Sequence, residues 1–199
     1  MAKKILVISG DGGESYEVLY AYHRFQEAGY VPELAAPSKR MLNLVMHDFE
    51  PGWDTYVERP GYKMAADLAI ADAKSEGYEA ILLIGGRAPE YLRNDPRLRA
   101  LVREFDAAGK WIFAVCHGIQ ILTASGLAKG RRLTCYEHVR CEVEDCGGTF
   151  VDRSCVRDGN VVSAQTWQDH PAFFREIFAC LDAAPADSAR FASAAAQTA

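Results

Sequence analysis

The chain has 199 residues, of which 49% are hydrophobic and 25% charged, as expected for one globular domain with a substantial core. A formal charge of −5 makes nucleic acid and anionic membrane surfaces unexpected partners. The start, MAKKILVISG, lacks a cleavable signal pattern and no later apolar run is long enough to span a bilayer, so we expect a cytoplasmic protein. In that compartment the six cysteines are expected to be thiols, and no paired CxxC or HxxxH spacing indicates a metal site.

Predicted strands and helices alternate along most of the chain. Apolar runs predict strands over 4–9, 31–36, 80–84 and 111–115, and helical spacing predicts helices over 14–28, 68–75 and 95–108. Short segments at 131–134, 149–151, 155–157 and 161–164 precede a final predicted helix over 171–181. Because parallel strands need crossover connections, this order predicts an α/β fold with a parallel sheet between two helix layers.

The predicted sheet belongs to a single domain over residues 1–182. The remaining residues, 183–199, are rich in Ala and Ser and have little apolar surface to bury. We expect this tail to be frayed or disordered.

Polar residues follow three of the predicted strands at their carboxyl ends, where ligands bind in such sheets. The strands run into GDGGESYE, GGRAPEYL and CHGIQ, which place Glu14, Glu90, Cys116 and His117 at one edge. A thiol at a strand-to-helix junction lies near helix N–H groups that favour the thiolate, so we expect a lowered pKa for Cys116. The same N–H groups, with those of residues 85–86, could bind an oxyanion.

The strings GGRAPEYLR and AVCHGIQIL resemble the signature of the ThiJ/PfpI superfamily, which includes the DJ-one proteins, and the similarity extends from about residue 4 to 181. Within it, VMHDFEPGWDTYVERPGY and TWQDHPAFF resemble the plant DJ-type glyoxalases. The resemblance implies a flavodoxin-like sandwich, as in class I glutamine amidotransferases. It also implies that Cys116 is a nucleophile on a sharp elbow and that Glu14 hydrogen-bonds its sulfur.

Further site residues follow from the same resemblance. His117 is expected to assist proton transfer, and Glu90 to complete a Cys-His-Glu set across a subunit contact, so a homo-oligomer (dimer, trimer or hexamer) is expected. Gly86, Arg87 and His170 are expected on the substrate side. No cofactor and no metal is expected.

The leading functional hypothesis is a glutathione-independent, cofactor-free glyoxalase or deglycase that acts on small 2-oxoaldehydes such as methylglyoxal. The alternatives are a PfpI-type cysteine peptidase, a redox sensor or chaperone whose Cys116 oxidises to a sulfinic acid, and a small carbon–nitrogen hydratase. An amidotransferase is disfavoured because the later string is His170-Pro171-Ala172, without the glutamate that orients the base. The aromatic and charged segment 46–62 is expected to form a hairpin that supports the site and contacts a neighbouring subunit.

Overall fold

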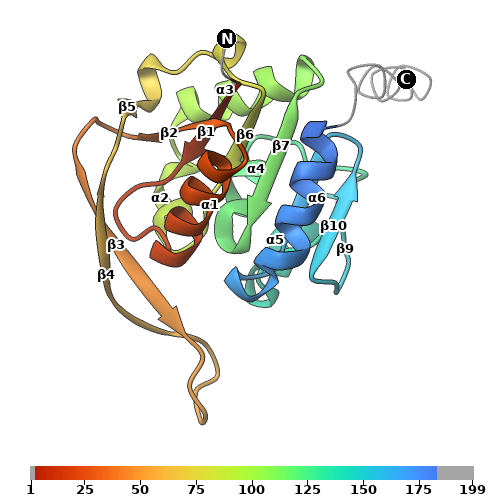
Figure 1. Cartoon of the computed structure of the whole chain (residues 1–199). Helices are drawn as coiled ribbons and strands as arrows, with labels where there is room; N and C mark the ends of the chain where they lie inside the picture. The colour runs from red at the N-terminus through yellow and green to blue at the C-terminus, as the bar shows by residue number, and fades with distance from the viewer. Residues whose placement is uncertain (1–2, 183–199) are drawn as a thin grey trace.

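The computed structural model describes residues 3–182 and shows a seven-stranded sheet between two layers of helices (Figure 1). The strand order is β10-β11-β7-β6-β1-β2-β5, and all neighbours are parallel except β10 and β11. The strands are β1 (Lys4–Ile8), β2 (Val31–Ala36), β5 (Leu68–Ala69), β6 (Ala80–Leu83), β7 (Trp111–Val115), β10 (Cys155–Asp158) and β11 (Val161–Ala164). The central strands are apolar and buried on both faces, which explains their continuous hydrophobic runs. The predicted α/β fold is confirmed.

Helices cover both faces of the sheet. Helices α1 (Ser15–Glu27) and α6 (His170–Asp182) pack on one face, and α3 (Pro96–Ala107) and α4 (Ile119–Ala124) pack on the other (Figure 1). The short helices α2 (Ala88–Leu92) and α5 (Arg140–Asp145) contact α4. Asp95 caps α3 and Glu14 caps α1 through side-chain oxygens that accept backbone N–H groups. These local signals explain why both helices begin where the sequence predicted.

A long hairpin projects from the edge of the domain (Figure 1). It is formed by β3 (Met41–Asp48) and β4 (Val57–Ala65), which pair antiparallel. The middle of β3 lies against the loop before α1, because a bridge joins Glu14 to Val45. The hairpin expected in segment 46–62 is confirmed, and its strands extend beyond that segment on both sides. A separate two-stranded sheet pairs β8 (Arg132–Leu133) with β9 (Thr149–Phe150).

The predicted helix over 68–75 is wrong. The chain forms β5 there, followed by the 3-10 turns η1 (Ile70–Asp72) and η2 (Ser75–Gly77). The Asp67 carboxylate accepts the backbone N–H of Leu34 at 2.7 Å and fixes this segment along β2. Tertiary pairing with the sheet edge therefore overrides a helical pattern too short to nucleate by itself.

Three other expectations concern membrane spans, the cysteines and the C-terminal tail. No helix of residues 3–182 is long and apolar enough to cross a membrane. All six cysteines lie in the described part of the chain and are free thiols, as predicted. The tail expected to be disordered, 183–199, lies outside the described residues.

Candidate active site

Cys116 lies on a strained elbow at the end of β7. The 3-10 turn η3 (Cys116–Gly118) follows at once, and Cys116 has φ 57°, the only positive φ of a non-glycine residue in the described chain. Such backbone costs on the order of 1–3 kcal/mol and persists where the surroundings fix it. A side chain at Gly85 would collide with Cys116, and one at Gly118 would collide with the Leu83 carbonyl. The two glycines therefore allow the tight packing that holds the elbow.

The sulfur is buried among polar groups. The backbone N–H groups of His117 and Gly86 interact with it and lower the thiol pKa, and His117 Nδ1 lies 3.3 Å from Sγ. Burial and the negative charge of Glu17 act in the opposite direction and raise the pKa of Cys116 well above its ordinary value. The lowered pKa expected from the sequence is therefore wrong, because two N–H groups do not offset a nearly complete loss of solvent.

The carboxyl against the sulfur belongs to Glu17. Its side chain is 1% exposed, and Oε2 accepts the Gly85 N–H at 2.7 Å. The Cys116 thiol lies against this carboxyl, whose other oxygen has no nitrogen or oxygen partner among the described residues. Burial, reinforced by the charge of Glu14, raises the pKa of Glu17 to about 8. Glu17 is thus protonated at neutral pH and able to donate to a thiolate.

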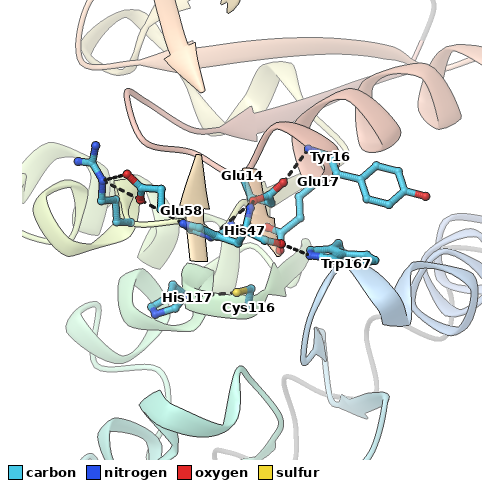
Figure 2. A network of polar contacts seen from close by, with 10 residues as sticks. Glu14, Tyr16, Glu17, His47, Glu58, Cys116, His117 and Trp167 are labelled. Carbon is cyan, nitrogen blue, oxygen red and sulfur yellow. Dashed lines mark hydrogen bonds and ion pairs between the residues drawn. The ribbon is translucent and has the colours of Figure 1, made fainter. Parts of the chain in front are cut away.

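This position corrects the expectation for Glu14. Its Oε1 accepts the Tyr16 N–H at 3.0 Å and its Oε2 accepts the His47 N–H at 2.8 Å (Figure 2). Both oxygens are therefore used to cap α1 and to attach the hairpin. Burial raises the pKa of Glu14 to about 7.

The sequence contained a pattern that could have identified Glu17 as a site residue. It falls on the buried stripe of α1 with Ala21 and Phe25, at intervals of four residues. A glutamate in such a stripe requires a buried partner. The thiol at the end of β7 is that partner.

His117 is buried beside the thiol, while Glu90 lies elsewhere. The ring of His117 faces Tyr56 and Tyr136, with centroid distances of 5.8 and 5.1 Å, and burial lowers its pKa to about 4. Glu90 is exposed on α2, and within residues 3–182 its carboxyl makes no hydrogen bond to His117. The chain therefore brings Cys116 and His117 together without Glu90, whose role across a subunit contact stays a prediction.

The three expected substrate-side residues have different surroundings. Gly86, at φ 72°, directs its N–H at the sulfur and so lies beside Cys116, while its substrate role stays a prediction. Arg87 is half exposed and its Nε donates to both carboxylate oxygens of Glu58, at 3.0 and 2.9 Å.

The substrate-side expectation for His170 is wrong. Its ring is 2% exposed and stacks on Tyr20 with centroids 4.6 Å apart, between α1 and α6. Neither ring nitrogen has a hydrogen-bond partner in the described structure. Because α6 starts at His170 and packs on α1, the ring becomes part of an aromatic core instead of the site.

Two residues of the segment 46–62, which was expected to support the site, and Trp167 of a later turn also border it, although none of the three was given a site role from the sequence. His47 contacts Glu14, Tyr56 stacks on the His47 ring at 3.9 Å, and Trp167 Nε1 donates to the His47 carbonyl at 3.1 Å (Figure 2). A cavity of about 300 Å³ adjoins Glu14 and His47, with Trp167 in its lining. Within the described residues, no three or more His, Cys, Asp or Glu side chains are grouped as a metal site.

Comparison with known proteins assigns the family. A sequence model of the DJ-1/PfpI family matches residues 3–180. The chain belongs to the DJ-1/PfpI family. The match covers nearly the whole described chain, including the sandwich fold and the elbow cysteine.

Relatives within the DJ-1/PfpI family agree with this assignment. Protein DJ-1 homolog D of Arabidopsis thaliana is 38% identical over 90% of this chain, which spans only 48% of that relative's length. Deglycase PfpI of Pyrococcus furiosus is 34% identical over 87% of this chain and 96% of its own length. Among solved structures, Drosophila melanogaster DJ-1beta superposes with a TM-score of 0.77 at 22% identity, covering 98% of this chain and 97% of its own, which supports the flavodoxin-like fold.

Proposed function

We propose that this protein is a cofactor-free glyoxalase or deglycase that acts on small 2-oxoaldehydes such as methylglyoxal. One observation carries the proposal: a strained, buried cysteine lies against a buried carboxyl whose pKa is raised to about 8. A carboxyl with such a pKa can both remove and return a proton near neutral pH. The relative named Deglycase PfpI supports the choice of carbonyl chemistry.

The first step is addition of the Cys116 sulfur to the aldehyde carbon. His117 is neutral, because its pKa is about 4, so Nδ1 can accept the thiol proton and pass it to the aldehyde oxygen. The product is a hemithioacetal. The N–H groups of Gly86 and His117 interact with the sulfur and favour the thiolate that attacks.

Isomerisation and hydrolysis complete the reaction. Ionised Glu17 removes the proton from the former aldehyde carbon, giving an enediolate, and returns it to the neighbouring carbon, while the hydroxyl proton of the first carbon passes to the oxygen of the second. The first carbon is oxidised to a thioester while the second is reduced to an alcohol, so no external redox partner is needed. Water then cleaves the thioester, releasing a hydroxy acid and restoring the Cys116 thiol.

A cysteine peptidase is the second candidate, favoured by the contact between Cys116 and His117 within one chain. This function would require a carboxyl to orient His117. We assign that role to Glu90 of a neighbouring subunit in a homo-oligomer, because within the described chain Glu90 is exposed and apart from His117.

The experiment compares lactate formation from methylglyoxal with casein cleavage, and includes an isonitrile to detect hydratase activity. Cys116→Ser should abolish turnover. Glu17→Gln keeps the shape of the side chain but cannot move protons, so turnover should fall by about a hundredfold or more. The matched variant Glu90→Gln should cost much less. Wild-type lactate formation by Glu17→Gln would refute the mechanism, and casein cleavage that depends on Glu90 would establish the peptidase instead.

A further inference from the structure

Tyr56 ends the loop that joins β3 to β4 and lies among the side chains that surround Cys116. Its ring stacks on that of His47, with centroids 3.9 Å apart, and meets the ring of His117 edge-on at 5.8 Å. Nδ1 of His117 lies 3.3 Å from Sγ of Cys116. The Tyr56 ring therefore contacts a group that itself contacts the reacting sulfur.

The loop that carries Tyr56 is fixed by a segment outside the hairpin. Oγ1 of Thr55 is hydrogen-bonded to the hydroxyl of Tyr136 at 3.0 Å, and Nε2 of His138 donates to the Asp54 carbonyl at 2.9 Å. The rings of Tyr56 and Tyr136 also pack together, with centroids 5.5 Å apart. These contacts hold the phenol in place before a ligand arrives, which reduces the cost of ordering it on binding.

Two phenol groups lie near the thiol, and their hydroxyl groups differ in what they bind. Burial raises the pKa of both Tyr56 and Tyr136, and negative charge on Cys116 raises both further. The hydroxyl of Tyr136 is bonded to Thr55, whereas that of Tyr56 makes no hydrogen bond within residues 3–182. Because the pKa of Tyr56 is raised above its ordinary value of 10, this hydroxyl keeps its proton at neutral pH and is able to donate to a ligand.

We propose that Tyr56 contacts the substrate and donates a hydrogen bond to the second carbonyl oxygen of the 2-oxoaldehyde, next to the carbon that Cys116 attacks. Glu17 and the N–H groups of Gly86 and His117 interact with the sulfur, so the Tyr56 hydroxyl is the donor left for this oxygen. The oxygen gains negative charge when the proton leaves the first carbon, and an O–H donor stabilises the resulting enediolate. The inference rests on the proposed function, since it names a contact to that substrate.

An alkylating ketone tests this contact without requiring turnover. The Cys116 thiolate forms a carbon–sulfur bond with chloroacetone as chloride leaves, and the product carries a ketone next to the new bond, as the hemithioacetal of methylglyoxal does. Allyl bromide also gives a thioether, but it has no carbonyl oxygen. Peptide mass spectrometry measures the rate constant of each reagent at Cys116. The ratio of the two rate constants cancels any change in the amount of thiolate.

Tyr56→Phe removes the hydroxyl and keeps the ring. The ratio of the chloroacetone rate to the allyl bromide rate should fall at least about threefold, as for the loss of one hydrogen bond. The kcat for lactate formation should fall at least about tenfold with KM changed less than about threefold, because the enediolate carries more charge than the ketone. The matched control is Tyr62→Phe, which removes a hydroxyl from β4 at a residue that is 67% exposed and should keep wild-type values.

Circular dichroism verifies that both variants are folded. A smaller fall of the alkylation ratio in Tyr56→Phe, or an equal fall in Tyr62→Phe, overturns the inference. Lactate formation by Tyr56→Phe at the wild-type rate overturns it as well. If the wild-type protein forms no lactate but the ratio falls as expected, the glyoxalase is refuted and the contact between Tyr56 and a carbonyl oxygen stands.

Discussion

Replacing His170 by phenylalanine should make the protein resist acid better. Burial of this imidazole lowers its pKa from 6.5 to about 4, and neither ring nitrogen has a partner in the described structure. The unfolded chain therefore binds a proton more readily than the native protein. The stability contribution of the neutral ring is fully present above pH 6.5 and is lost as the pH falls through about 4.

The magnitude follows from these two pKa values. As the pH falls from 7 to 5, this difference should lower the unfolding free energy of the wild-type protein by about 2 kcal/mol. The full loss, reached below pH 4, is about 3 kcal/mol. Phenylalanine cannot be protonated, and its ring suits a position between Tyr20 and Phe174. In His170→Phe the difference in unfolding free energy between pH 7 and pH 5 should therefore shrink by about 2 kcal/mol.

Urea titrations at pH 5, 6 and 7 measure this difference. A poor fit of the larger ring would lower stability at every pH, but it would leave the change in pH dependence intact. The control is His23→Gln, at an exposed position on α1, which should keep the wild-type pH dependence. An undiminished loss of stability from pH 7 to pH 5 in His170→Phe would refute the reasoning.

Three further predictions concern Glu17 and its glycine neighbour. Methylglyoxal turnover should rise about tenfold per pH unit and level off above about pH 8, because the Glu17 base must be ionised, and a flat profile from pH 6 to 9 would contradict this. Because the pKa of Glu17 is raised, its contribution to stability is full below the unfolded value of 4.5 and is lost as the pH rises through about 8. At pH 9 the unfolding free energy of Glu17→Gln, measured by urea titration, should therefore exceed that of wild type by about 2 kcal/mol or more. Gly85→Ala should lower turnover by about a hundredfold, because the added methyl group meets both Cys116 and the Glu17 carboxyl, whereas Gly77→Ala, with open space around it, should keep wild-type activity.

Much of the fold was predictable because its signals are local. Fully buried parallel strands need unbroken apolar runs, and the starts of α1 and α3 follow from the capping residues Glu14 and Asp95. The segment at 68–75 was not predictable in this way, because pairing with the edge of β2 decides its conformation. A short segment has too little intrinsic helix stability to resist such a contact.

The sequence by itself determined that a cysteine follows β7 and that acidic residues begin the helix facing it. It did not determine which acid contacts the sulfur, because Glu14 and Glu17 are three residues apart and lie on the same side of a helix. The tertiary structure decided this by drawing Glu14 to the N–H groups of Tyr16 and His47 and leaving Glu17 with the thiol. It also decided the pKa values of these groups, because a pKa depends on how far distant segments exclude solvent and on the charges that they place around the group.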